Sequence, residues 1–325
     1  KGGFFQQGGH ANKGGVVVLA QDGSRDIRKA AKDIASLAAQ FEGQRVEFVM
    51  LDSTGNADKA ALLKAAEKAG IELRILVDDT QLVAEELGLT RALEVAILDP
   101  KAKELVYRGA LNDRFAKGKK ARRASEYYVA DALTAFITDQ EIAAPAFTSN
   151  GEAIDFSAKS AQIAAVSYAN DVAPILEQRC VTCHQEGGIA PFAMSSHQMV
   201  QGWSPMIREV LITKRMPPTQ VDPNIGHFSN ARYMTDGDLQ TLVHWIDAGA
   251  PRGVAAIDPL TEIDLPNWKE WSLGEPDFIV KAPKMEIPAT GVLDYIDVDV
   301  ELPFDEDKWV KAVEFVAGDT TVLHH

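Results

Sequence analysis

The chain of 325 residues contains only two cysteines, Cys180 and Cys183, and His184 directly follows the second one. Two thiols at this spacing beside an imidazole fit the covalent attachment of a haem: the thiols add to the vinyl groups and the imidazole reaches the iron. A structural zinc site would need four ligands, and no second Cys/His pair at similar spacing supplies them. A redox-active dithiol remains the alternative, although it does not require the histidine. The motif therefore predicts one haem c, held by two thioethers and by His184.

Length and charge narrow the other possibilities. A chain this long exceeds one haem domain and predicts two or three compact units. Its net charge of −14 argues against nucleic acid and anionic membranes as partners. Residues 256–325 hold 16 Asp/Glu and 5 Lys/Arg, so this last fifth carries most of the charge. No apolar run is long enough to span a bilayer, so no transmembrane segment is expected.

Residues 16–150 alternate between short apolar runs and amphipathic stretches. Strands are expected at 16–20, 46–51, 75–77, 94–99 and 104–108, and helices at 27–41, 57–69, 82–87 and 125–137. Such alternation predicts a mainly parallel or mixed sheet covered by helices, an α/β domain.

The runs Val77–Leu89 and Val95–Asp99 resemble the thioredoxin-like redoxin/peroxiredoxin family, and the resemblance extends over nearly all of residues 16–150. The segment departs from that family where its chemistry would lie. Residues 22–25 contain no cysteine, and Leu93 stands near the place of the family's cis-proline. Because a serine hydroxyl cannot cycle through a disulfide, we expect a redox-inactive scaffold or docking domain.

The haem motif lies between two expected helices. Residues 168–179 would form a helix that delivers Cys180, and the sequence Thr235–Asp238 is a capping-box pattern that would open a second helix ending at Gly249. An opening helix, the haem motif, a variable middle and a closing helix resemble class I cytochromes c. The resemblance implies an all-α domain over residues 168–255.

The sixth ligand of the iron is less constrained, because five methionines lie in this segment: Met194, Met199, Met206, Met216 and Met234. Cytochromes of this kind place the axial methionine before a proline, which implies Met216, followed by Pro217. His227 is the main alternative and His244 a weaker one. Met/His ligation would give a higher reduction potential than bis-histidine ligation.

The C-terminal segment has a strand pattern. Residues 293–302 alternate strictly between apolar and polar side chains, which predicts a half-buried antiparallel strand, and residues 309–316 predict another. These strands, the intervening Pro303–Asp307 and the terminal pair His324 and His325 resemble the start of the copper type II, ascorbate-dependent monooxygenases. The resemblance implies a partial β-sandwich in which the histidine pair would bind copper only within a complete domain. A purification-tag stub or two exposed terminal histidines are alternative explanations of the pair.

Together these features predict a multidomain chain with α/β, all-α and β parts. The expected boundaries are a flexible N-terminus (1–15), a thioredoxin-like domain (16–150), a linker (151–167), a cytochrome c domain (168–255), a second linker (256–272) and the first strands of a copper monooxygenase-like domain (273–325). The order resembles a bacterial protein truncated within its third domain.

The predicted function is electron transfer through one haem to a redox partner protein, in a complete protein to a copper monooxygenase centre. Covalent haem is attached outside the bacterial cytoplasm, so a periplasmic or extracellular location is expected, with an export signal upstream of Lys1. The alternative is a docking or assembly subunit of a multi-haem complex. A third possibility, a thiol or peroxide oxidoreductase, is disfavoured because the two cysteines are already assigned to haem. The sequence leaves the oligomeric state open.

Overall fold

A computed structural model describes residues 15–21, 24–55, 59–218, 226–228, 233–265, 270–291, 293 and 296–319. The chain divides into two compact units. The first holds Lys1–Ala165, Arg208–Met216 and Met234–His244, and the second holds Val166–Ile207, Pro217–Tyr233 and Trp245–His325. The domain boundaries given by the sequence remain predictions.

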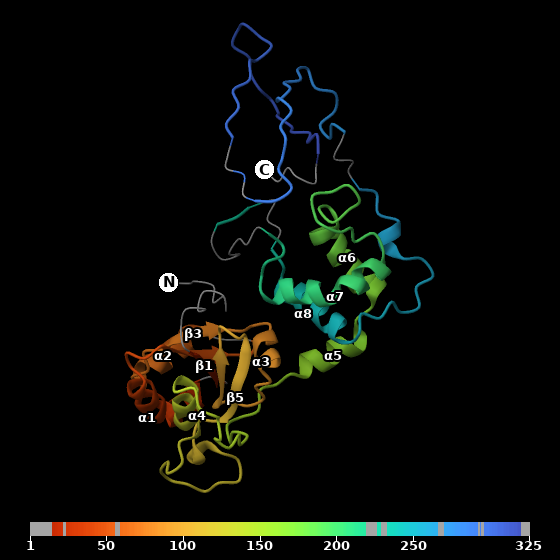
Figure 1. Cartoon of the computed structure of the whole chain (residues 1–325). Coiled ribbons are helices and arrows are strands. Elements are labelled where there is room, and N and C mark those ends of the chain that lie inside the picture. The colour runs from red at the N-terminus through yellow and green to blue at the C-terminus, as the bar shows by residue number, and fades with distance from the viewer. Residues whose placement is uncertain are drawn as a thin grey trace. The chain divides into compact units, whose positions relative to one another are not determined.

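The first unit contains a five-stranded sheet with helices on both faces (Figure 1). Its strands are β1 (Gly15–Gln21), β2 (Val46–Asp52), β3 (Arg74–Val77), β4 (Glu94–Asp99) and β5 (Glu104–Ala110). Its helices are α1 (Ser24–Gln40), α2 (Lys59–Lys68), α3 (Leu82–Leu87), η2 (Asp113–Phe115), α4 (Tyr128–Ile137) and α5 (Ser157–Ala165). The expected strands and helices of residues 16–150 are therefore confirmed, although α4 begins three residues later than expected. Helix α5 lies within residues 151–167, the segment expected to be a linker.

The strand order β3-β2-β1-β4-β5 makes the sheet mixed. Strand β1 pairs in parallel with β2 and antiparallel with β4, β2 pairs in parallel with β3, and β4 and β5 form an antiparallel hairpin. The parallel pairs need crossover connections, which α1 and α2 provide, while β4 and β5 are joined by a short turn. This arrangement is consistent with the predicted thioredoxin-like fold.

The two faces of the sheet are buried in separate apolar clusters. Along β1, Val17 and Leu19 pack in one cluster with residues of α1, α2 and α4. Val16 and Val18 pack in the other, with residues of α3 and with Ile154. Successive side chains of a strand point to opposite faces, so the apolar run of β1 identifies a strand covered on both sides.

Residues 149–151, in the segment after α4, form hydrogen bonds with Arg91 and Ala92, just before β4. The hydroxyl of Ser149 donates to the carbonyl of Ala92 at 2.6 Å, and the guanidinium of Arg91 donates to the carbonyl of Gly151 at 3.0 Å. A Cβ atom at Gly151 would lie 2.1 Å from the carbonyl oxygen of Ala92. Only glycine allows the backbone to come this close, which explains the residue at this position.

The segment that leads to Cys180 and Cys183 is helical from Tyr168 to Val181. It consists of a π-helical turn η3 (Tyr168–Val172), the short helix α6 (Ala173–Leu176) and a second π-helical turn η4 (Glu177–Val181). The amide of Ser167 donates to Asp171, and the amide of Asn170 donates to the hydroxyl of Ser167. This reciprocal cap fixes the start of the helix that delivers Cys180.

Two longer helices follow, α7 (His197–Ile212) and α8 (Asp236–Asp247), each with residues in both units. The capping box predicted for α8 is confirmed, because the amide of Asp238 donates to the hydroxyl of Thr235 and the amide of Thr235 donates back to Asp238.

Helix α7 was not predicted and contains Pro205. Proline cannot donate to the carbonyl of Gln201, and the hydroxyl of Ser204 takes that place at 2.8 Å.

One expectation for the C-terminal segment, that it forms strands, is wrong. After the 3-10 turn η5 (Pro259–Thr261), the described residues up to 319 form no helix and no strand. The strands expected at 293–302 and 309–316 are not formed by the described residues there, and Ile296, Val298 and Val300 are exposed. An alternating sequence makes a strand only when another strand and an apolar layer cover it, and the described chain supplies neither here.

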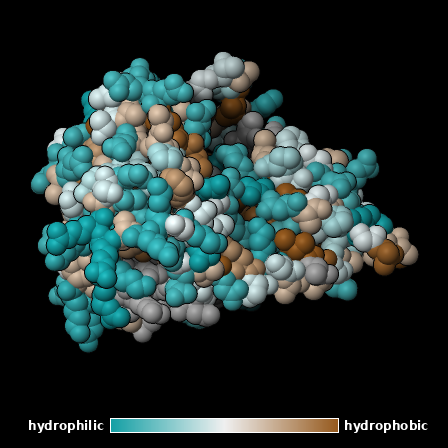
Figure 2. All heavy atoms as spheres, turned by 90° about the horizontal axis from the view of Figure 1, so that it is seen from below, coloured by the Kyte–Doolittle hydropathy of each residue, from teal (hydrophilic) through white to brown (hydrophobic). Residues whose placement is uncertain are grey.

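On the face drawn in Figure 2, hydrophilic residues predominate and hydrophobic ones occur in small patches. Within the residues that the structure describes, no helix combines the length and the hydropathy that a membrane crossing requires.

Candidate functional site

The turn after η4 brings the three motif residues together. The amides of Cys183 and His184 both donate to the carbonyl of Cys180, at 3.1 and 3.0 Å. Helical geometry therefore continues through the motif and presents the two sulfur atoms about one turn apart. That Cys180, Cys183 and His184 hold a haem remains a prediction.

The two cysteines are free thiols rather than a disulfide. Burial and, to a smaller extent, the charge of Cys183 raise the pKa of Cys180 to about 12, with the charge of Arg179 acting in the opposite direction. A redox dithiol needs a thiolate at neutral pH, which requires a lowered pKa. The environment of Cys180 thus disfavours the dithiol alternative.

His184 is held in one orientation by the backbone. Its side chain is buried, and Nδ1 lies 3.0 Å from the carbonyl oxygen of Phe192. A carbonyl can only accept, so Nδ1 carries the proton and Nε2 keeps its lone pair. Burial lowers the pKa of His184, and the hydrogen bond to Phe192 opposes that shift in part. The result is a neutral imidazole with one nitrogen available to a metal, the form in which histidine ligates iron.

Aromatic side chains continue from His184 to α7. The ring centroid of Phe192 lies 4.6 Å from that of His184 and 4.5 Å from that of Trp203, on which it stacks at an interplanar angle of 16°. Met199, Trp203 and Met206 follow one another at helical spacing, and all three are more than a third exposed. We call these three residues the apolar stripe of α7.

The opposite face of α7 is buried. Val200, Ile207 and Leu211 are buried, so the apolar stripe is additional to the face that packs inward. A solvated helix face normally carries polar residues. Of this stripe, Trp203 is connected to His184 through Phe192, and an exposed apolar stripe of this kind is a candidate binding surface.

The expected sixth ligand lies beyond the end of α7. The amide of Met216 donates to the carbonyl of Val210 at 3.2 Å, and the side chain of Met216 is 37% exposed. The side chain of Met216 is therefore not part of the buried apolar core. Ligation of iron by Met216 remains a prediction.

The other candidates lie in different environments. His227 is exposed. His244 is buried, and its Nε2 lies 3.1 Å from a carboxylate oxygen of Glu85, within the first unit. Met194 is buried, and its amide donates to the carbonyl of His184 at 2.7 Å. Sequence reasoning did not single out the contacts of Phe192 and Met194 with His184, because both depend on how the loop after the motif folds.

The remaining metal prediction lies outside the part of the chain that the structure describes. His324 and His325 are not among the described residues. Among the residues that are described, no group of three or more His, Cys, Asp or Glu side chains is placed to hold a metal ion.

In the first unit, the positions where thioredoxin-like enzymes keep their chemistry hold other residues. Asp22 and Gly23 lie outside the described residues, and α1 begins at Ser24. Leu93, near the place of the family's cis-proline, is buried with a φ of 62°. A left-handed leucine is strained, and the surrounding hydrogen bonds of Glu94 to the amides of Thr90 and Arg91 hold it there.

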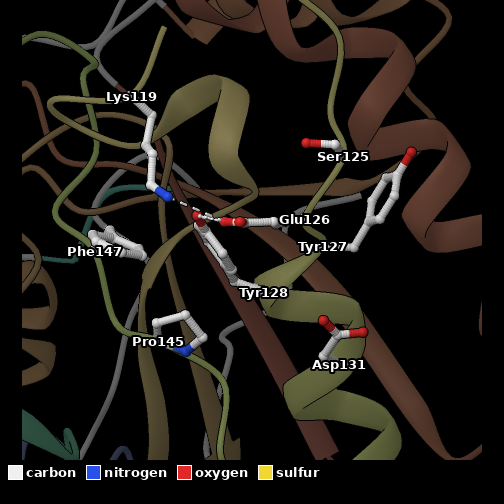
Figure 3. Close-up of a pocket in the computed structure, with 8 residues that line it drawn as sticks. All are labelled: Lys119, Ser125, Glu126, Tyr127, Tyr128, Asp131, Pro145 and Phe147. Atoms are coloured by element: carbon white, nitrogen blue, oxygen red, sulfur yellow. Dashed lines mark hydrogen bonds and ion pairs between the residues drawn. The ribbon is translucent and has the colours of Figure 1, made fainter. Parts of the chain in front are cut away.

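The first unit also contains a hollow of ≈ 490 Å³ that sequence reasoning did not identify. Its wall includes Tyr127, Tyr128, Pro145 and Phe147, with Lys119 and Glu126 among the polar residues. Figure 3 shows Lys119, Glu126 and the hydroxyl of Tyr128 converging, with Phe147 and Pro145 to one side of them. The hydroxyl of Tyr128 donates to Glu126 at 2.6 Å, and Lys119 pairs with Glu126 at 3.4 Å.

Comparisons with known proteins give a limited result. No protein-family model and no curated protein match this chain. The solved structures similar to it include a hypothetical protein from Sinorhizobium meliloti, 20% identical with a TM-score of 0.40, over 47% of this chain and 85% of that one. They also include a secreted disulfide oxidoreductase from Mycobacterium tuberculosis, 12% identical with a TM-score of 0.27, over 39% of this chain and 83% of that one. A lipoprotein thioredoxin from Streptococcus pneumoniae is 16% identical with a TM-score of 0.29, over 42% of this chain and 90% of that one.

Proposed function

We propose that this chain is an exported c-type cytochrome that transfers electrons through one covalently attached haem. The observation that carries the proposal is the hydrogen bond from Nδ1 of His184 to the carbonyl of Phe192, which leaves Nε2 available beside two free thiols. When bound, the haem would supply one-electron transfer, its iron passing between the ferrous and ferric states. The export follows from the chemistry, since bacteria attach haem to thiols outside the cytoplasm.

The residues of the chain would hold the group and shield it. Cys180 and Cys183 would form the thioethers, and His184 would ligate the iron through Nε2. Phe192 and the apolar stripe of α7 would pack on the ring system and exclude water from it, which favours the less charged ferrous state. Met216 is proposed as the sixth ligand.

The first unit is proposed to be a redox-inactive domain. It contains no cysteine, so it cannot run thiol–disulfide chemistry. Its role would be structural or in docking.

The attachment is tested by expressing the chain in a bacterial periplasm that matures cytochromes c. Intact-mass analysis should show the polypeptide plus one haem, and the absorption spectrum should show a reduced low-spin haem. The double variant Cys180→Ala/Cys183→Ala should lose the covalent mass, while Thr182→Ala, between the two cysteines, should keep it. A polypeptide mass with free thiols in the unaltered chain would overturn the proposal.

The sixth ligand is tested on the same material. Met216→Ala should abolish the weak red absorption band that marks sulfur ligation of ferric haem, and should lower the reduction potential. His227→Ala should leave both unchanged. A spectrum of the unaltered chain without that band, changed by His227→Ala and not by Met216→Ala, would assign the position to His227.

The electron acceptor is proposed from the resemblance of residues 273–325 to copper monooxygenases. In a protein that continues into a complete copper domain, a ferrous haem would give one electron to Cu(II), producing ferric haem and Cu(I). Rapid mixing of such a protein with reductant measures this step. Equal rates of copper reduction with and without Cys180 and Cys183 would exclude the route.

A further inference from the structure

One loop of the first unit concentrates positive charge in an acidic protein. Residues 117–123 contain five basic side chains and no acidic one. All five basic residues are exposed: Lys117, Lys119, Lys120, Arg122 and Arg123. Among the described residues only Lys119 has an ion-pair partner, Glu126. We call residues 117–123 the basic loop.

The basic loop borders the hollow shown in Figure 3. The ammonium of Lys119 lies 5.1 Å from the ring centroid of Phe147, and Tyr127, on the same wall, is 52% exposed. Aromatic rings and a proline beside positive charge form a surface that suits another aromatic side chain flanked by acidic residues.

The C-terminal segment offers that combination. Residues 296–307 contain six acidic side chains and no basic one. They lead to Trp309, whose side chain is fully exposed. Asp305 and Asp307 are exposed and form no ion pair within the described residues, while Glu306 pairs with the adjacent Lys308. We call residues 305–309 the acidic motif.

We propose that the acidic motif of a second copy of this chain docks on the basic loop, with the indole of Trp309 in the hollow. Both segments are exposed and carry opposite charge, and this complementarity within one sequence is what favours a second copy as the partner. Several exposed ion pairs acting together, with one buried indole, give a moderate, salt-sensitive affinity rather than a permanent assembly. This inference does not depend on the haem.

The association is tested by sedimentation velocity of the full chain over a range of concentrations. At about 20 mM salt the chain should form dimers or larger assemblies, and at about 500 mM salt, where charges are screened beyond a few ångströms, it should dissociate. Lys120→Glu/Arg122→Glu/Arg123→Glu should weaken the association at least about tenfold, and Asp305→Lys/Glu306→Lys/Asp307→Lys should do the same. Mixing the two charge-reversed chains should restore it.

Matched controls separate a specific contact from general charge effects. Lys101→Glu/Lys103→Glu changes two exposed lysines in the turn between β4 and β5 and should leave the association unchanged. Trp309→Ala should weaken it about tenfold, while Phe315→Ala, at another exposed aromatic residue, should change it less than about twofold.

Three outcomes would overturn the proposal. The first is a monomer at every concentration in low salt. The second is failure of the charge-reversed pair to associate on mixing. The third is a concentration-independent crosslink between the basic loop and the acidic motif of a single copy, which would show that docking occurs within one molecule. Binding of the loop to RNA in place of the second copy, measured by competition with a labelled oligonucleotide, would assign it to a different partner.

Discussion

Nδ1 of His184 and the carbonyl oxygen of Phe192 are 3.0 Å apart, and this one contact determines which imidazole nitrogen is free. The contact links His184 to the loop that follows it, so the chain itself fixes the orientation of the imidazole. Pre-orientation of a histidine by a backbone carbonyl is a common way to fix its tautomer at metal sites.

From this contact we expect His184→Ala to remove the proposed iron ligand while the haem stays covalently attached. The thioethers depend on Cys180 and Cys183, so the covalent mass should remain, while the low-spin spectrum should be replaced by a high-spin one. Added imidazole should restore the low-spin bands, because the vacated space lies beside Phe192. Mass spectrometry and absorption spectra check both statements; an unchanged spectrum would show that another residue ligates the iron.

A second prediction concerns Tyr168, whose hydroxyl donates to Asp258 at 2.6 Å. Tyr168→Phe should reduce the free energy of unfolding by about 1.5–3 kcal/mol, since it removes a hydrogen bond to a charged group. Tryptophan fluorescence reports the loss, because Trp245 stacks on Tyr168 at 5.7 Å.

The pH dependence of this contact has a definite sign. Burial would raise the pKa of Asp258, but hydrogen bonds from Tyr168 and from the amides of His197 and Leu260 outweigh it and lower the pKa. A lowered carboxyl pKa adds stability above the unfolded-state value of about 4, and this stability is lost as the pH falls through the folded-state value. In Tyr168→Phe, unfolding measured between about pH 7 and pH 3 should therefore show a smaller acid-induced loss.

Asp78 should behave in the opposite way. Burial raises the pKa of Asp78, although its oxygens accept from the hydroxyl of Ser53 and the amides of Val83 and Ala84. The folded state then holds a proton more tightly than the unfolded state, so this group favours folding at low pH and less so as the pH rises above about 4.

The variant Asp78→Asn separates the charge from the hydrogen bonds. It should remove this pH dependence and, because an amide nitrogen would face donors, cost about 2 kcal/mol at neutral pH. Urea unfolding of both proteins across the pH range measures the two effects. A pH profile identical to that of the unaltered chain would contradict the assignment.

Gly151 and Gly202 lie in different surroundings, so an alanine substitution at each gives one stability prediction and its control. Gly151→Ala should destabilise the first unit by about 2–3 kcal/mol, because its Cβ would lie 2.1 Å from the carbonyl of Ala92. Gly202→Ala, in α7 with nothing within 4 Å of the new Cβ, should stabilise by about 0.5–1 kcal/mol. Thermal unfolding of the two variants checks the direction of both stability changes. Equal shifts would show that residues 149–151 can move away from Ala92 without an energetic cost.

The sequence identified those features that depend on local patterns. The elements of residues 16–150 follow from apolar periodicity, and the cap of α8 follows from Thr235 and Asp238, which lie three residues apart. Helix α7 escaped prediction because Pro205 interrupts its pattern, and the substitute hydrogen bond from Ser204 is visible only in three dimensions. The strands expected at 293–302 and 309–316 failed for the converse reason: their pattern is local, but strand formation depends on a partner elsewhere.

In the candidate site, too, the sequence identified the residues set by local spacing and missed those whose contacts depend on the fold. Cys180, Cys183 and His184 are adjacent in sequence and were found by their spacing. The roles of Phe192 and Trp203 depend on a loop and a helix that fold back on the motif, so no spacing rule could assign them.

Residues 278–291 and 296–315, which form no helix or strand, have a practical consequence for anyone who handles this protein. A protease binds its substrate in an extended form, which the described residues of these ranges can adopt because they form no helix or strand and are mostly exposed. Digestion should begin there and leave a trimmed core that still contains both cysteines. Residues 278–325 hold 10 Asp/Glu and 4 Lys/Arg, so a core trimmed back to Phe278 would keep a net charge of −8 out of −14 and should bind an anion exchanger more weakly than the intact chain.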